Sequence, residues 1–153
     1  MALFLSSYIN KIDKKGRVSV PSQFRHALSM EEFNGIIIYK SFINNCLEAC
    51  GLSRIEYISN NIDKLDPYSE IRDAFATAIL GGCLQLSIDP EGRVLLPEEI
   101  LAQSNLNEFA GFVGKGKTFE IWSPEEFKSH QEKARVLAGK ERLMLHFNNA
   151  GDK

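Results

Sequence analysis

Hydrophobic and polar positions alternate with a period of two near the start of the chain, and a turn sequence follows. The alternation over Tyr8–Ile12 predicts a β-strand, and residues Asp13–Gly16 have the composition of a turn. An Asp at the start of such a turn can accept a hydrogen bond from the backbone two residues on, and a Gly at its end accepts a positive φ. Arg17–Val20 is therefore predicted to be the return strand, with Val18 and Val20 on one face.

The residues that follow change to a helical period and then to buried strands. Pro21 fits the first position of a helix, where its missing N–H costs nothing. The apolar face of this helix would be formed by Phe24, Ala27 and Leu28. The apolar runs Gly35–Tyr39 and Cys46–Cys50 then predict two buried strands.

The middle of the chain has the pattern of two helices. Ser53 and Glu56 have the spacing of a capping box, which predicts the start of the first helix. Its inward face would carry Ile55, Ile58, Ile62 and Leu65. Asp66-Pro67 is expected to begin the second helix, and Gly81-Gly82 to end it. The second helix would turn Ile71, Phe75 and Ile79 inward.

The second half repeats the order of elements in the first. Residues 83–104 predict a strand, a turn, a strand and a helix, and Gly111–Trp122 predicts a hairpin. Ser123-Pro124 then opens a helix that is expected to run to about Ala138. The residues after Phe147 are expected to fray, as chain ends commonly do.

One short motif accounts for this repetition. The pattern I-D-x-x-G-R-V-x-[VL]-P occurs at residues 12–21 and again 76 positions later at residues 88–97, with six identities in ten positions and no gap. A chain of 153 residues fits one compact domain or two small halves that share one core. The internal repeat favours two similar halves.

The two copies differ in charge. Residues 11–25 hold five basic side chains against one acidic, a balance of +4, whereas residues 87–101 hold one basic side chain against four acidic, a balance of −3. The whole chain has a net charge of −2, so any binding of nucleic acid must come from local charge. Lys and Arg at a tight turn can reach phosphates, and Arg can bind a guanine edge with two hydrogen bonds.

The first copy of the motif therefore indicates a surface that faces a polyanion. The alternative is a solvated turn that Asp13 and Gly16 build and Arg17 braces. That alternative explains the Asp, the Gly and the Pro of both copies, but it does not explain their opposite charge.

The sequence contains no set of residues typical of an active site or a metal site. Neither copy of the motif has a nucleophile beside a base or a pair of suitably spaced carboxylates. Cys46, Cys50 and Cys83 are too few for a disulfide framework, and the three histidines lie at no metal-ligand spacing from them. We therefore expect buried reduced thiols, no enzymatic activity and no cofactor. The N-terminal apolar run is too short for a signal peptide and no segment has the length of a membrane span, so a cytoplasmic protein is expected.

A second motif has to be weighed because it points to a different class of protein. Gly111–Thr118, "GFVGKGKT", satisfies the phosphate-loop pattern G-x-x-x-x-G-K-T of nucleotide hydrolases. That loop must run directly into a helix whose N-terminus binds phosphate. Here the next residues, "TFEIW", alternate as a strand does, which favours a β-hairpin over a nucleotide site.

The stretches "NKIDKKGRVSVPSQFR", "SIDPEGRVLLP" and "FEIW" resemble the MraZ family of bacterial transcriptional regulators. The resemblance implies two SpoVT–AbrB-type modules at residues 7–54 and 83–126, a helical connector at 55–82, and a C-terminal helix and tail at 127–153. The implied fold is α+β: an AbrB-like swapped-hairpin or double-psi-like β-barrel made of two pseudo-symmetric halves, with peripheral helices.

The same resemblance implies a function. Members bind double-stranded DNA at short direct repeats upstream of the cell division and cell wall gene cluster, including their own promoter, as ring-shaped homo-oligomers associated with the nucleoid. An AbrB-like module that binds a protein partner is the alternative within this class. The resemblance and the charge together predict the DNA-binding residues Lys11, Lys14, Lys15, Gly16, Arg17, Arg25 and Arg93. Family members often carry an Arg in the helix of each copy, and Leu101 stands at that position in the second.

Overall fold

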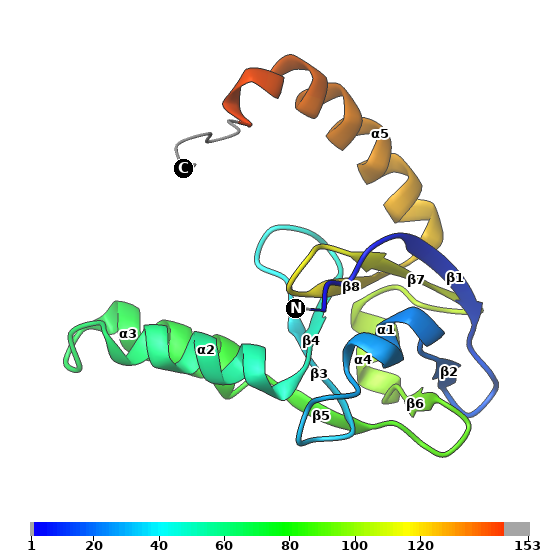
Figure 1. Ribbon diagram of the computed structural model, residues 1–153, viewed down its shortest axis with the longest axis horizontal. Coiled ribbons are helices and arrows are strands. Elements are labelled where there is room, and N and C mark those ends of the chain that lie inside the picture. The colour runs from blue at the N-terminus through cyan, green and yellow to red at the C-terminus, as the bar shows by residue number, and fades with distance from the viewer. Residues whose placement is uncertain (1, 146–153) are drawn as a thin grey trace.

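The computed structural model describes residues 2–145 and shows an α+β protein built on an antiparallel sheet (Figure 1). Six strands form the main sheet in the order β1-β7-β8-β4-β3-β5, and β2 and β6 form a separate two-stranded ladder. The strands are β1 Ser7–Lys11, β2 Arg17–Ser19, β3 Gly35–Lys40, β4 Leu47–Cys50, β5 Leu84–Ser87, β6 Arg93–Leu95, β7 Phe109–Gly114 and β8 Phe119–Trp122. The helical elements are α1 Ser22–Ala27, α2 Leu52–Asp63, α3 Glu70–Phe75, η1 Ala76–Leu80, α4 Glu98–Gln103, α5 Pro124–Lys140 and η2 Arg142–Met144.

The two copies of the motif exchange strands. The first strand of each copy pairs with the strand after the helix of the other copy: β1 pairs with β7, and β5 pairs with β3. The predicted return strand is therefore wrong in its partner, because β2 pairs with β6, and its β-pairing with the preceding chain is limited, among the described residues, to one bridge between Ile12 and Val18. Pairing across the copies places Val18 opposite Val94, and both side chains are buried in the common core.

The core lies between the main sheet, the ladder and α1. Phe24 of α1 is its centre, with ring contacts to Phe4, Phe112 and Phe119 at centroid distances of 5.3, 6.5 and 4.8 Å. The predicted apolar face of α1 is confirmed, since Phe24 and Leu28 are buried and Ala27 packs against the core. Pro21 is the N-cap of α1 and not its first residue, one position from the prediction.

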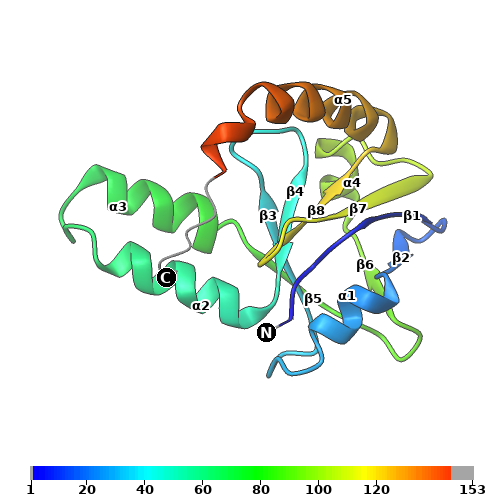
Figure 2. The same cartoon turned by 45° about the horizontal axis from the view of Figure 1, so that its top comes forward.

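Helices α2 and α3 form a hairpin that projects from the sheet (Figures 1 and 2). The predicted capping box is wrong. The N-cap of α2 is Gly51, and the Ser53 N–H and Oγ–H instead donate to the two carboxylate oxygens of Glu31, at 2.8 and 2.7 Å. The cap thus comes from the loop after α1, which no local pattern in the helix could reveal.

The second helix of this hairpin begins later than predicted. Asp66 accepts a hydrogen bond from the Tyr68 N–H, and the Ser69 side chain accepts one from the Arg72 N–H, so Ser69 is the N-cap and α3 starts at Glu70. The helical segment ends before Gly81, as predicted.

The predicted inward faces of these helices are only partly confirmed. Ile62 and Ile79 are buried, but Ile71 and Phe75 are 61% and 40% exposed. They are exposed because the hairpin projects from the sheet, so that, among the described residues, α3 lies mainly against α2 (Figure 2).

The rest of the second half agrees with the sequence pattern. Strands β7 and β8 form the predicted hairpin, and α5 follows with Ser123 as N-cap and Pro124 in its first turn. Helix α5 ends at Lys140, two residues beyond the prediction, and extends away from the sheet (Figure 1). The segment predicted to fray, after Phe147, lies outside the described residues.

Candidate nucleic-acid interface

The first turn is built by one carboxylate and one glycine. Asp13 Oδ1 accepts hydrogen bonds from the N–H groups of Lys15 and Arg17, both at 2.9 Å, and the Asp13 carbonyl accepts one from Gly16 at 3.0 Å. Gly16 has φ of +92°, and a Cβ there would lie 2.7 Å from the Leu96 carbonyl oxygen. The backbone N–H of Arg17 is the main cause that lowers the pKa of Asp13, with further help from the Arg17 guanidinium. The carboxylate is therefore a charged structural part of the turn.

The second turn has the same construction. Asp89 Oδ1 accepts from the N–H groups of Glu91 and Arg93, both at 2.9 Å, and Gly92 has φ of +82°. The backbone N–H of Arg93 is the main cause that lowers the pKa of Asp89. The shared Asp and Gly of the motif are thus explained by the turn alone.

The two arginines that close the turns differ in what surrounds their outer nitrogens. Arg17 Nε bonds Asp13 Oδ2 at 2.8 Å, and Arg93 Nε bonds Asp89 Oδ2 at 3.1 Å. Arg93 has a second ion pair, from Nη2 to Glu91 Oε1 at 2.6 Å. The position that corresponds to Glu91 in the first copy is Lys15. Among the described residues, the terminal nitrogens of Arg17 have no partner.

The β2–β6 ladder places both arginines on one surface. Arg17 lies opposite Leu95 and Ser19 opposite Arg93, while the intervening Val18–Val94 pair is buried. Because side chains alternate across a strand, Arg17 and Arg93 both lie on the outward face. They stand about 7 Å apart along the ladder, two residues of strand rise. A two-stranded β-ribbon of this kind is one of the elements that the DNA major groove admits.

Arg25 lies beside the second turn although it belongs to the first copy. Its Nε donates to the Val20 carbonyl at 3.0 Å, and its Cζ lies 2.8 Å from where a Cβ on Gly92 would be. Leu101, at the corresponding position of the second copy, lies beside Gly16 in the same way. The sequence pattern groups Arg25 with the basic turn of the first copy. In the structure its side chain lies beside the acidic turn of the second copy. The exchange of strands between copies is the cause, and only the cross-copy pairing reveals it.

The three lysines of the predicted site are exposed. Lys14 and Lys15 lie in the first turn, and Lys11 is the last residue of β1. Together with Arg17 they form what we call the basic turn, defined as Lys11, Lys14, Lys15 and Arg17.

The phosphate-loop pattern lies on a hairpin, as the sequence context predicts. Its first four residues are in β7, and the Lys115 N–H donates to the Thr118 carbonyl at 2.9 Å to close the turn. Gly116 has φ of +92° and pairs with Phe4, and β8 follows instead of a helix. The backbone amides needed to bind phosphate at a helix N-terminus are therefore not gathered in this segment.

The thiols are reduced and the prediction that they are buried holds for two of them. Cys46 and Cys50 are buried and Cys83 is half-buried, and burial is the main cause that raises the pKa of Cys46 and of Cys50 to about 12. Within residues 2–145, no group of three or more His, Cys, Asp or Glu side chains is placed to hold a metal ion. No helix in the same part of the chain has both the length and the apolar character that crossing a membrane requires.

The fold and this surface define a protein that presents arginine on a narrow β-ribbon, with Lys14 and Lys15 exposed in the turn that leads into it, which is typical of a nucleic-acid-binding protein. Comparison with known proteins gives the family. The family model described as "MraZ protein, putative antitoxin-like" matches residues 79–147. The chain is 50% identical to the transcriptional regulator MraZ of Rickettsia akari over 149 residues, covering 97% of this chain and 100% of the relative. It is 53% identical to that of Rickettsia bellii over 150 residues, with the same coverage. The chain therefore belongs to the MraZ family of transcriptional regulators, which confirms the resemblance seen in the sequence.

Proposed function

We propose that this protein regulates transcription by binding double-stranded DNA through its basic turn. The observation that carries the proposal is the difference between the two arginines on the outward face of the ladder. The terminal nitrogens of Arg17 are open among the described residues, whereas Arg93 is paired with Glu91. The same scaffold thus presents one arginine able to bind a base and one that is already neutralised.

The geometry supports distinct roles for the residues of the basic turn. Asp13 holds Arg17 by its Nε, so the two terminal nitrogens keep a fixed direction. In the major groove such a guanidinium can donate to O6 and N7 of one guanine. Lys11, Lys14 and Lys15 are exposed beside it and would contact phosphates, which position a protein without reading sequence. Gly16 keeps the turn tight, and Arg25 offsets part of the acidity of the second turn.

The architecture proposed for this function has two SpoVT–AbrB-type modules, residues 7–54 and 83–126, with 55–82 as connector and 127–153 as C-terminal helix and tail. The pairing of β1 with β7 and of β5 with β3 supports a swapped-hairpin arrangement. We further propose a ring-like homo-oligomer in the cytoplasm, associated with the nucleoid and without catalytic activity. Its operators would be short direct repeats, including those at its own promoter and the cell division and cell wall cluster.

A matched pair of variants tests the DNA surface. Arg17→Ala should weaken binding to the protein's own promoter DNA by about 1–3 kcal/mol, which is about fivefold to more than a hundredfold in Kd. Arg93→Ala removes the equivalent side chain from the same fold and should change Kd much less, because Glu91 already neutralises that arginine. Fluorescence anisotropy measures both affinities, and circular dichroism checks that both variants fold. A folded Arg17→Ala protein with unchanged affinity, or equal losses in the two variants, would refute the proposal.

A further inference from the structure

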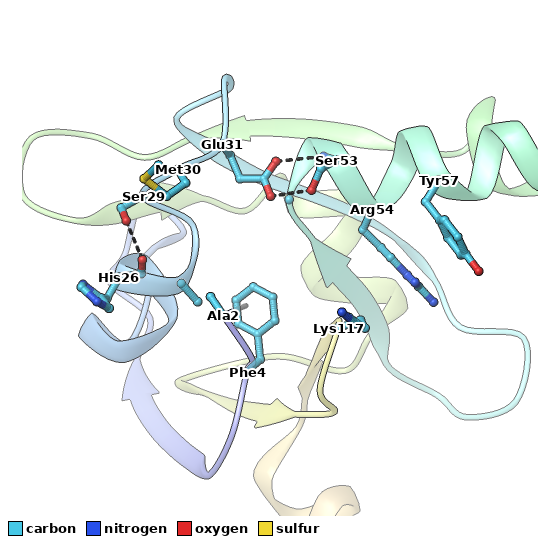
Figure 3. A pocket seen from close by; sticks show the side chains of 12 residues that line it. Ala2, Phe4, His26, Ser29, Met30, Glu31, Ser53, Arg54, Tyr57 and Lys117 are labelled. Atoms are coloured by element: carbon cyan, nitrogen blue, oxygen red, sulfur yellow. Dashed lines mark hydrogen bonds between the residues drawn. The ribbon is translucent and has the colours of Figure 1, made fainter. Parts of the chain in front are cut away.

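A pocket of about 840 Å³ opens on a part of the molecule that the proposed DNA surface does not use (Figure 3). It lies between the N-terminal arm, the loop after α1, the first turns of α2 and the β7–β8 turn. The side chains that matter for its chemistry are Phe4, Met30, Glu31, Arg54, Tyr57 and Lys117. Its volume falls in the range of about 300–1,000 Å³ that is usual for small-molecule sites.

The single acidic residue among those that line this pocket already accepts hydrogen bonds from the protein. Both carboxylate oxygens of Glu31 accept hydrogen bonds from Ser53, at 2.8 and 2.7 Å, and so cap the start of α2. Gly51 permits this approach, since a Cβ there would lie 2.6 Å from Glu31 Cδ. Glu31 has no ion pair with Arg54 among the interactions of the described residues.

Arg54 is the unusual group of the pocket. Its Nε is buried and has no hydrogen-bond partner among the described residues, while its guanidinium carbon lies 4.7 Å from the centroid of the Tyr57 ring. Leaving such a donor without a hydrogen-bond acceptor costs about 1–3 kcal/mol of stability, and more where the group is charged. The Nε has no accessible surface, so a ligand would reach this guanidinium through its terminal nitrogens, which are not buried and have no hydrogen-bond partner among the described residues. Unsatisfied donors at the wall of a cavity indicate an acceptor that a ligand brings.

The other residues that line the pocket indicate the chemistry of the rest of the ligand. Lys117 adds a second cation from the β7–β8 turn, and Figure 3 shows Arg54 and Lys117 entering from different elements. Ala2, Phe4, Ala27, Met30 and Tyr57 supply an apolar and aromatic lining. We propose that this pocket binds a small amphipathic organic anion, with a carboxylate or phosphate group at Arg54 and an apolar or aromatic body against Phe4 and Met30. The site contains none of the residues of the basic turn and goes beyond the DNA-binding function.

Calorimetry with three probes tests the site on the full chain. Phenyl phosphate has both the anion and the aromatic body, inorganic phosphate has the anion alone, and benzyl alcohol has the ring without charge. Phenyl phosphate should bind saturably and at least tenfold more tightly than either of the other two. Arg54→Gln should weaken it at least tenfold. Arg72→Gln is the matched control, because Arg72 lies on the same helical hairpin, pairs with Asp63 and does not line the pocket. The Arg72→Gln variant should bind phenyl phosphate with the affinity of the parent.

A second pair of variants keeps the test valid if Arg54→Gln fails to fold. Met30 is 93% exposed, so Met30→Glu should leave the fold intact while its charge repels the anion, and Met30→Gln should bind as the parent does. Equal binding of phenyl phosphate to the parent and to the folded Arg54→Gln or Met30→Glu variant would overturn the proposal. No binding of phenyl phosphate would overturn it too. If sedimentation then showed that Arg54→Gln alters the assembly, the pocket would be a contact between copies. All these readouts are independent of DNA, so they fail or succeed separately from the proposed function.

Discussion

Two positions, Lys14 against Pro90 and Lys15 against Glu91, distinguish two turns that are otherwise built alike. Asp13 and Asp89 make the same hydrogen bonds, and Arg17 and Arg93 bond them through the same nitrogen. Glu91 then pairs with Arg93, where the first copy has Lys15. The sequence shows the difference in charge, and the structure shows its consequence for the arginine. The internal repeat thus contains one basic turn, whose arginine keeps its terminal nitrogens unpartnered among the described residues, and one turn whose arginine is paired with Glu91.

At the residue scale, the glycine of the turn gives a stability prediction. Gly16→Ala should destabilise the protein by more than 1 kcal/mol, because Gly16 has φ of +92° and its new Cβ would lie 2.7 Å from a backbone carbonyl. Gly139→Ala is the matched control within α5, where nothing lies within 4 Å of the new Cβ. It should stabilise by up to about 1 kcal/mol through helix propensity. Urea unfolding measures both changes, and a Gly16→Ala variant as stable as the parent would contradict the account of the turn.

The elements themselves could largely be predicted from the sequence, whereas their partners could not. A continuous apolar run identified β3, and the alternation in "TFEIW" identified the β7–β8 hairpin, because both patterns depend only on the burial of one strand's own residues. The partner of β2 depends on a strand 76 residues away, and no local pattern encodes that choice. The predicted cap of α2 was wrong for the same reason, since the acceptor at the start of this helix is Glu31 and not a residue of the helix.

Across β4 and β8, a pair of acids gives a pH prediction at the element scale. Glu48 lies directly opposite Glu120, and Glu120 is buried, accepts a hydrogen bond from Trp122 Nε1 at 2.8 Å and lies 3.5 Å from Lys115 Nζ. Burial first, and then the charge of Glu120, raise the pKa of Glu48. A raised pKa means that the folded state binds this proton more tightly than the unfolded chain does. Stability therefore falls as the pH rises above the ordinary pKa of Glu, and the loss is complete once the pH exceeds the folded pKa of Glu48.

Glu48→Gln should therefore raise the thermal midpoint at pH 7, because it removes the cost of ionising this position. The gain should shrink as the pH falls and vanish below the ordinary pKa of Glu, where Glu48 is protonated in both states. Glu56→Gln on the exposed surface of α2 is the control, and its thermal midpoint should differ little from that of the parent at any of the pH values. Scanning calorimetry at several pH values measures this, and a gain that is independent of pH would rule out ionisation as the cause.

At the scale of the whole molecule, composition indicated the class of protein less clearly than the local arrangement of charge. The chain is slightly acidic, and its basic turn is a small part of the surface. The structure adds that Arg25 lies at the other turn, which spreads positive charge along the ladder. It also shows that α3 projects with Ile71 and Phe75 exposed, which helical periodicity could not predict because it gives a face and not what covers it.

The number of DNA contacts available to one chain leads to a prediction about assembly. The basic turn offers one arginine for base contact, and a good bidentate pair gives about 1–3 kcal/mol of discrimination. Specific regulators typically need about 4–10 kcal/mol over non-specific DNA. The second turn is too acidic to supply the difference, whereas several linked subunits that present the same turn can supply it by raising the effective concentration.

We therefore expect a closed homo-oligomer whose operator holds several direct repeats, spaced near the helical repeat of about 10–10.5 base pairs so that the turns meet one face of the duplex. Light scattering should give a molar mass several times that of the 17.2 kDa chain. Deleting repeats one at a time should lower the affinity, and the fall should be steep when binding is no longer multivalent. Scrambling the sequence of a spacer without changing its length should have little effect. Changing a spacer by half a helical turn should weaken binding as much as deleting the repeat, because the second turn would then face away from the groove. A monomer that binds one repeat as tightly as the full operator would show that a single basic turn is sufficient and that assembly has another purpose.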